Sequence, residues 1–306
     1  MKKIIVDVGG ADAGPEVMIK GAMEAAGETG CGIILAGDRR VIEEAAGSAF
    51  EIIDAPGTVT AQDNPAKIIK GMEDTSMVRA LEALKSRDDI IGMVSAGSTG
   101  CLLVGASFRL GLFKGLLQPA LSSALPKDGG GWVCLLDCGA NLGSRVRDLQ
   151  DWARMGSAYM EAVKGTEMPR VGLVNVGREP GKGTDLYREA YAALLADTSI
   201  NFIGNIEGSD ILSGEVDVAV CDGFTGNVLL KGLEAAGKLA AKMADSKQIS
   251  DFFNYNSLGG ATFLGTKKIV VKAHGAADEL TVKSCIRQVW NLSRGSFIEK
   301  MAERFI

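Results

Sequence analysis

Short apolar runs alternate with longer amphipathic stretches along the whole chain. Runs of this length, bounded by glycine and polar residues, predict β-strands that are buried in a sheet. They lie at residues 3–8, 32–36, 50–53, 90–95, 132–137, 171–176, 201–206, 216–222 and 269–273. Strands that alternate with helices form a mostly parallel sheet covered by helices, so the sequence predicts an α/β fold.

Start and stop signals place several helices between these strands. Pro15 opens a predicted helix at 15–28, Thr75 caps one at 76–86, and Thr184 with Asp185 caps one at 186–195. Glycines at 30, 111 and 165 read as stop signals. Because no linker or internal repeat interrupts the pattern, we expect one domain over residues 1–306, with a short excursion near 240–260.

Several of the predicted strands end in the same kinds of residue, namely polar residues together with glycine. One such end is ordinary loop chemistry, but several together predict one shared cleft, because the carboxyl ends of parallel strands lie at the same edge of a sheet. These ends lie at residues 7–10, 95–100, 137–141, 175–177, 222–227 and 274–275.

The strand end at residues 216–228 has the sharpest signal. An apolar strand leads into Asp222 and a glycine-flanked loop, and a helix is predicted from about Thr225 to Met243. Free amides in the first turn of a helix, together with its dipole, favour a phosphate by roughly 0.3–1 kcal/mol. Asn227 is expected in that first turn. Lys182, which lies between glycines before the helix at 186–195, is either a solvated loop residue or the cation that offsets the phosphate charge.

Other features of the sequence restrict the reactions that this site could catalyse. His274 is the only histidine of the chain, which disfavours hydrolases that activate serine or cysteine with an imidazole. The phosphate-binding motifs of ATP and NAD proteins are absent from the sequence. Inorganic phosphate attacking a thioester fits better, because the nucleophile is already ionised and a thiolate leaves without a strong acid. His274 is then either a structural residue or the proton donor to the leaving thiol.

Composition bears on compartment and partners. A net charge of −5 and a pI near 5.2 argue against a nucleic-acid binder. The N-terminus lacks a signal-peptide pattern and no apolar run approaches the ~20 residues of a membrane span, so we expect a cytoplasmic protein. The cysteines lie mostly in apolar runs, as expected of reduced core thiols. We expect no metal and no cofactor.

These motifs resemble the bacterial phosphate acyltransferases of phospholipid synthesis, the PlsX family, over nearly the whole chain. The matching stretches are residues 95–100, 136–141, 155–157, 201–208, 221–227 and 272–275. The resemblance implies a Rossmann-like three-layer α/β/α sandwich, similar to phosphotransacetylases, in a homodimer. It also implies a reaction in which acyl carrier protein thioester and inorganic phosphate give acyl phosphate, which a downstream acyltransferase consumes.

The resemblance also assigns residues. The family's essential lysine and asparagine fall on Lys182 and Asn227, which with His274 are the candidate catalytic residues. Substrate binding is expected from loop residues at the strand ends, namely Gly97, Ser98, Thr99, Gly100, Asp137, Asn141, Asp222, Gly223, Thr225 and Gly226.

Two departures from the family pattern concern the substrate. A basic stretch is replaced at residues 69–77, and a long amphipathic hairpin is reduced to a short connection at 242–255, so we expect at most weak membrane association. Three alternatives stay open: an acyl carrier protein donor with long acyl chains, a divergent enzyme that uses acyl-CoA or a partner enzyme's short-chain thioester, and a catalytically silent binding protein of the same fold.

Overall fold

A computed structural model of the chain describes residues 1–253 and 258–305. The chain divides into two compact units, of which unit 1 comprises residues 1–113 and 256–298 and unit 2 comprises residues 114–255 and 299–306. The single domain predicted over residues 1–306 stays a prediction. Within the predicted excursion near 240–260, residues 254–257 lie outside the described part of the chain.

Unit 1 contains a sheet in the order β3-β2-β1-β4-β11-β10. Its strands are β1 (Lys3–Asp7), β2 (Gly32–Gly37), β3 (Glu51–Asp54), β4 (Ile90–Ser95), β10 (Ala261–Leu264) and β11 (Ile269–Lys272). All pairs are parallel except that of β10 with β11. Ile4, Ile5 and Val6 of β1 are fully buried, as expected of an interior strand with helices on both faces.

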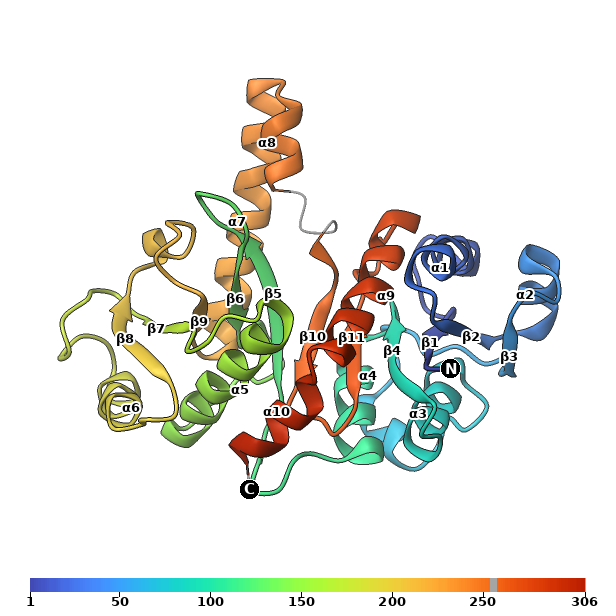
Figure 1. Cartoon of the computed structure of the whole chain (residues 1–306), viewed down its shortest axis with the longest axis horizontal. Helices are drawn as coiled ribbons and strands as arrows, with labels where there is room; N and C mark the ends of the chain where they lie inside the picture. The colour runs from blue at the N-terminus through green and yellow to red at the C-terminus, as the bar shows by residue number, and fades with distance from the viewer. Residues whose placement is uncertain (254–257, 306) are drawn as a thin grey trace. The chain divides into compact units, whose positions relative to one another are not determined.

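Connectivity explains why helices cover both faces of this sheet. The chain passes from β1 to β2 on one side and later from β3 to β4 on the other side of β1, so right-handed crossovers put the two connecting helices on opposite faces. Figure 1 shows α1 with α9 on one side of the strands and α3 on the other. The helices are α1 (Pro15–Thr29), α2 (Arg39–Ala46), α3 (Ser76–Ser86), α4 (Thr99–Gly105), α9 (Glu279–Arg294), the 3-10 helix η1 (Pro65–Ile69) and the π-helix η2 (Ala106–Leu110).

Unit 2 contains a sheet in the order β5-β6-β9-β7-β8, parallel except for β5 against β6. Its strands are β5 (Ala120–Pro126), β6 (Trp132–Leu136), β7 (Arg170–Val174), β8 (Asn201–Ile206) and β9 (Val218–Val220). Its helices are α5 (Val146–Lys164), α6 (Asp185–Leu195), the 3-10 helix η3 (Gly208–Asp210), α7 (Gly223–Ala244) and α8 (Lys247–Phe252). The last helix of the chain is α10 (Phe297–Arg304).

The predicted strands are all present, and the predicted α/β class with a mostly parallel sheet is confirmed. Two further strands, β5 and β10, were missed, because β5 contains two serines and ends in proline while β10 contains a threonine and lies between glycines. Thr75 and Thr184 occupy N-cap positions, but neither side chain caps its helix. Instead, the Thr75 hydroxyl donates to the carbonyl oxygen of Met72 at 2.6 Å.

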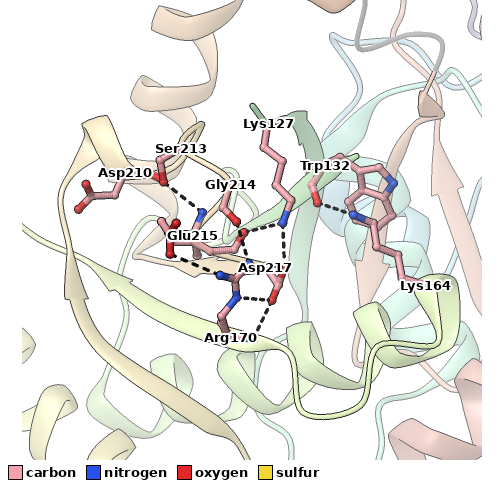
Figure 2. Close-up of polar contacts among 10 residues, drawn as sticks. Lys127, Trp132, Lys164, Arg170, Asp210, Ser213, Gly214, Glu215 and Asp217 are labelled. Carbon is pink, nitrogen blue, oxygen red and sulfur yellow. Dashed lines mark hydrogen bonds and ion pairs between the residues drawn. The ribbon is translucent and has the colours of Figure 1, made fainter. Parts of the chain in front are cut away.

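An ion-pair cluster in unit 2 ties the amino-terminal ends of β7 and β9 to the carboxyl-terminal end of the antiparallel β5 (Figure 2). The Asp217 carboxylate, which precedes β9, accepts from Lys127 Nζ at 2.8 Å and from the backbone N and Nε of Arg170, each at 3.0 Å. Burial alone would raise the pKa of Asp217, but the hydrogen bonds from Arg170 and Lys127 hold it well below its usual range. The cluster therefore fixes this edge of the sheet, opposite the edge that carries the candidate site.

The segment after the predicted Asn227 helix forms a short helical hairpin. In Figure 1, α8 folds back along the end of α7. The contact is close, since a Cβ at Gly237 of α7 would lie 2.5 Å from Cγ of Phe253. Leu239 and Met243 of α7 are 58% and 78% exposed. None of the helices in the described residues is both long and apolar enough to cross a membrane.

Candidate active site

Asp137 organises the loop that follows β6 in unit 2. Its carboxylate is fully buried and accepts hydrogen bonds from the backbone amides of Leu121 (2.9 Å), Ala140 (3.1 Å) and Asn141 (2.8 Å). The Asn141 side chain donates to the same carboxylate at 3.0 Å. Burial raises the pKa of Asp137, against the opposing effect of these donors. Two of the predicted site residues, Asp137 and Asn141, therefore hold one loop in place.

Glycines let α7 approach this loop at backbone distance. A Cβ at Gly226 would lie 1.9 Å from the Asp137 carbonyl oxygen, and one at Gly223 would lie 2.1 Å from that of Asn141. Both distances are far below van der Waals contact, so no other residue type fits without a backbone shift. The predicted glycines are thus required by packing at the carboxyl ends of β6 and β9.

Asn227 lies directly over the turn at Cys138 and Gly139. Its Nδ2 donates to the Cys138 carbonyl oxygen at 3.2 Å, and a Cβ at Gly139 would lie 2.9 Å from that Nδ2. Gly139 also has a φ of +112°, which a side chain rarely tolerates. Because α7 begins at Gly223 rather than near Thr225, Asn227 lies two residues further into the helix than predicted, just beyond its first turn.

The amino terminus of α7 is occupied by a carboxylate of the chain itself. Asp222 is the N-cap, and its side chain accepts from Thr225 N at 2.9 Å and from Thr225 Oγ1 at 2.7 Å. Tyr187 of α6 donates its hydroxyl to Asp222 at 2.5 Å. These bonds hold the pKa of Asp222 below its ordinary value although burial opposes them. The expected supply of free first-turn amides is therefore reduced, and an anion needs other donors as well.

Lys182 lies in the loop between β7 and α6, as predicted. Its Nζ is 3.9 Å from Oε2 of Glu179, and its side chain is 50% exposed. The backbone of the loop is held more firmly, because Asn175 donates to the Lys182 carbonyl oxygen at 3.2 Å and Asn205 donates to that of Glu179 at 2.9 Å. Lys182 thus combines an anchored backbone with a side chain that is free to meet an anion.

The other predicted binding residues lie in unit 1, where β4 ends. The Ser95 hydroxyl donates to the buried Asp7 carboxylate at 2.6 Å and accepts from Gly97 N at 3.2 Å. Ser98 is the N-cap of α4 and accepts from the amide of Cys101 at 3.5 Å. Thr99 is exposed and Gly100 half-buried in the first turn of that helix. Within unit 1, Ser98 therefore acts as a helix cap.

His274 follows β11, the parallel neighbour of β4. Lys272 is opposite Ser95 in the register, so His274 and the loop after β4 leave the same edge of the unit 1 sheet. The imidazole is exposed, and its Nδ1 accepts from the Ala276 amide at 3.1 Å. This bond places the proton of the neutral ring on Nε2.

The family follows from comparison with known proteins. The family described as "Fatty acid synthesis protein" matches residues 2–300. A phosphate acyltransferase of Acetivibrio thermocellus is 37% identical over 99% of this chain and 96% of its own length, and one of Clostridium botulinum is 40% identical over 93% and 92%. The chain belongs to the phosphate acyltransferase family. The resemblance predicted from the motifs is confirmed, and the chain is an acyltransferase of fatty acid synthesis.

Solved structures support the fold of this phosphate acyltransferase. A phosphotransacetylase from Streptococcus pyogenes superimposes with a TM-score of 0.69 at 14% identity, covering 97% of this chain and 94% of the other. The EutD phosphotransacetylase from Staphylococcus aureus gives 0.61 at 15% identity, covering 98% and 94%. The Rossmann-like α/β fold, similar to phosphotransacetylases, is thus confirmed.

The predicted site residues of the acyltransferase fall into two groups, one in each unit. In unit 2, Asp137, Asn141, Asn227 and the glycines of α7 form one contact network. Tyr187 was missed, although it links α6, which begins directly after the Lys182 loop, to Asp222 at the start of α7. From the sequence it is one of several apolar-face residues of α6, and nothing marks its hydroxyl.

Lys272 was also missed as a separate candidate. It is 9% exposed, and its Nζ donates to the carbonyl oxygens of Ala96, at 3.1 Å, and Ala273. Burial lowers its pKa to about 8. A lysine that ends an otherwise apolar strand was the available signal. It joins the ends of β4 and β11, which carry Ser98 and His274.

Proposed function

We propose that this acyltransferase moves an acyl group from acyl carrier protein thioester to inorganic phosphate. An oxygen of phosphate forms a bond with the thioester carbonyl carbon, the C–S bond breaks, and the products are acyl phosphate and the carrier thiolate, which takes up a proton. No base is needed, because phosphate is ionised at neutral pH and the thiolate is a good leaving group. One observation carries the proposal: Asn227 is held by backbone packing over the end of β6, with its amide presented at the carboxyl edge of the sheet.

In this proposal the phosphate is held by side chains rather than by the start of α7. Asp222 already occupies the Thr225 amide, so the charge of the anion is balanced by Lys182 instead. The 3.9 Å separation from Glu179 is a weak exposed pair that a phosphate can displace. Asn227 Nδ2 uses one of its two hydrogens on Cys138, which leaves the second for a phosphate or oxyanion oxygen.

The roles of the unit 1 residues are part of the same proposal. Gly97, Ser98, Thr99 and Gly100 are proposed to contact substrate. His274 is proposed to donate a hydrogen bond from its Nε2–H to the sulfur of the leaving thiolate, which then takes up a proton from water. We also propose that the enzyme is a cytoplasmic homodimer whose product is consumed by a downstream acyltransferase.

A panel of donors tests this function. Purified full-length protein is incubated with phosphate and with acyl carrier protein or CoA thioesters of several chain lengths, and acyl phosphate is trapped as hydroxamate. Phosphate-dependent hydroxamate from carrier thioesters is the expected result. Preference for short-chain acyl-CoA selects the divergent donor, and no phosphate-dependent product from any donor refutes the enzymatic proposal in favour of a silent binding protein.

Variants then test the assigned residues. Lys182→Ala and Asn227→Ala should each lower turnover by about 100-fold or more, the usual loss on removal of one oxyanion or phosphate contact. Lys85→Ala serves as the matched control, because Lys85 is also exposed but lies in the last turn of α3. If Lys182→Ala keeps full activity and an unchanged free energy of unfolding, Lys182 is a solvated loop residue and not part of the site.

A further inference from the structure

A pocket of about 590 Å³ opens in unit 1 where β1, β2 and β3 end, outside the residues assigned to acyl transfer. This volume lies in the usual range for small-molecule sites. Its walls come from the loop after β1, the start of α2, and the long connection that follows β3. The strand end at residues 7–10 was among those singled out in the sequence, and acyl transfer as proposed makes no use of it.

The pocket contains an unused polar group at its base. Ser76 is 1% exposed and lines the pocket. Its Oγ is close enough to the Asp7 carboxylate to lower the pKa of that carboxyl, but within the described residues no partner meets it at hydrogen-bonding distance and angle. A Cβ at Gly9 would lie 2.4 Å from this oxygen, so the absence of a side chain there keeps the space beside the hydroxyl open. A buried hydroxyl without a partner costs free energy that a ligand can recover.

The charges of the lining exclude an anionic ligand. Asp12 and Asp38 are its charged side chains, and no lysine, arginine or histidine lines it within the described residues. Carboxylates accept hydrogen bonds from hydroxyl or amine groups, whereas they would repel the negative charge of a phosphate group. The apolar part of the lining comes from aliphatic side chains, including Val41 and Val59.

The position of Asp38 further restricts the class of ligand. It directly follows β2, and its side chain accepts only the Arg40 amide at 2.8 Å among described residues, which leaves an oxygen available. In doubly wound sheets, an acidic residue near the end of the second strand binds the ribose diol of a nucleoside, and glycines after the first strand allow close approach. Gly9 and Gly10 supply that approach here.

We propose that this pocket binds a nucleoside that carries no phosphate. Asp38 accepts hydrogen bonds from the ribose diol, the base lies against the aliphatic wall, and a polar atom of the ligand reaches Ser76. Asp12 repels nucleotides, because it lies in the loop before α1, where a phosphate would bind at the helix start. Binding at this pocket goes beyond acyl transfer.

Calorimetric titration of the full-length protein with adenosine tests the proposal. A ligand of this size with ordinary efficiency binds with a Kd on the order of 0.1 mM. AMP and free ribose should each bind at least about tenfold more weakly, because AMP adds charge and ribose lacks the base. No adenosine binding at millimolar concentration, or tighter binding of AMP, would overturn the proposal.

Variants locate the site. Asp38→Asn keeps the helix cap but weakens the acceptor, and should lower adenosine affinity about tenfold. Asp54→Asn is the matched control: Asp54 ends the neighbouring β3 and accepts from the first α2 amide, that of Arg39, at 3.1 Å, but does not line the pocket. Val41→Trp should abolish binding by filling the space. Unchanged affinity in both Asp38→Asn and Val41→Trp places adenosine elsewhere and refutes this site.

Discussion

Replacing Gly226 by alanine isolates the backbone contact on which the unit 2 site depends. The new methyl group would lie 1.9 Å from the Asp137 carbonyl oxygen and 3.0 Å from Sγ of Cys221. Ordinary contact begins at 3.4 Å, so α7 and the loop must separate by about 3.4 − 1.9 = 1.5 Å. The obstacle is backbone that Asp137 itself holds in place, and it has no free rotamer through which to escape.

The magnitude follows from two opposing effects. Overpacking of a rigid site costs about 3 kcal/mol, the upper end of the usual range. Glycine to alanine within a helix returns about 1 kcal/mol, so Gly226→Ala should lower the free energy of unfolding by about 2 kcal/mol net. A shift of this size also moves Asn227 away from Cys138, and positioning errors near 1 Å cost about 100-fold in turnover.

Gly232→Ala is the matched control in the same helix, because a Cβ there meets nothing within 4 Å. It should raise the free energy of unfolding by up to about 1 kcal/mol and leave turnover unchanged. Urea unfolding and the hydroxamate assay measure both quantities. Equal stability and equal turnover of the two variants would show that α7 does not depend on this contact, and the geometry argued for Asn227 would be wrong.

Other predictions concern the ion-pair cluster, a buried carboxylate and the membrane. Asp217→Asn leaves Lys127, which is 8% exposed, without its carboxylate, and should cost about 3 kcal/mol at pH 7 in urea unfolding. Because the folded-state pKa of Asp217 is lowered, this difference should persist at neutral pH and narrow only below about pH 4; a difference that vanishes near pH 6 would contradict the cause given. Burial raises the pKa of Asp7 from 3.8 to about 6, so the folded state binds an extra proton between these values and wild-type stability should fall as pH rises from about 4 to 6. Asp7→Asn should remove that fall, on the order of 2 kcal/mol, and a parallel pH profile for the variant would refute it. Sedimentation with anionic vesicles at low salt should pellet only a small fraction of the protein, because the lysines and aspartates of residues 242–253 cancel in charge and give little attraction to anionic lipid; strong salt-sensitive pelleting would contradict the expected weak association.

The sequence predicted the parallel strands because each is an apolar run between polar turns. It missed β5 and β10, although each pairs antiparallel with the strand that follows it in the chain, because neither segment is a continuous apolar run. Helix starts were placed to within two residues, yet the caps were assigned to Thr75 and Thr184, whose hydroxyls cap neither helix. Local propensity identifies where a helix begins, whereas the hydrogen bond that caps it depends on tertiary contacts.

The candidate site shows the same division. Glycines at 139, 223 and 226 were visible as a pattern, but only three-dimensional packing shows that they admit Asn227 and α7 to the loop at Asp137. Tyr187 was not distinguishable from core residues, and Lys272 stood out only as a lysine at the end of an apolar strand, because the significance of each comes from the partner that it meets across the sheet edge. Residue patterns within one segment can be predicted from the sequence, whereas contacts between side chains of different strands and helices cannot.

The cap at Asp222 changes how a phosphate would be held in this family member. A bare helix start offers amides and a dipole, which bind an anion without side chains. Here a carboxylate, itself fixed by Tyr187 and Thr225, occupies that position and cancels much of the dipole. A phosphate beside it must therefore be balanced by a full positive charge. Lys182 lies in a loop whose backbone is anchored while its side chain is half exposed, so the cation can adjust to the anion as it binds. In the proposed function, the capped helix and the adjustable lysine are therefore complementary: Asp222 fixes the start of α7, which carries Asn227, and Lys182 is proposed to supply the positive charge.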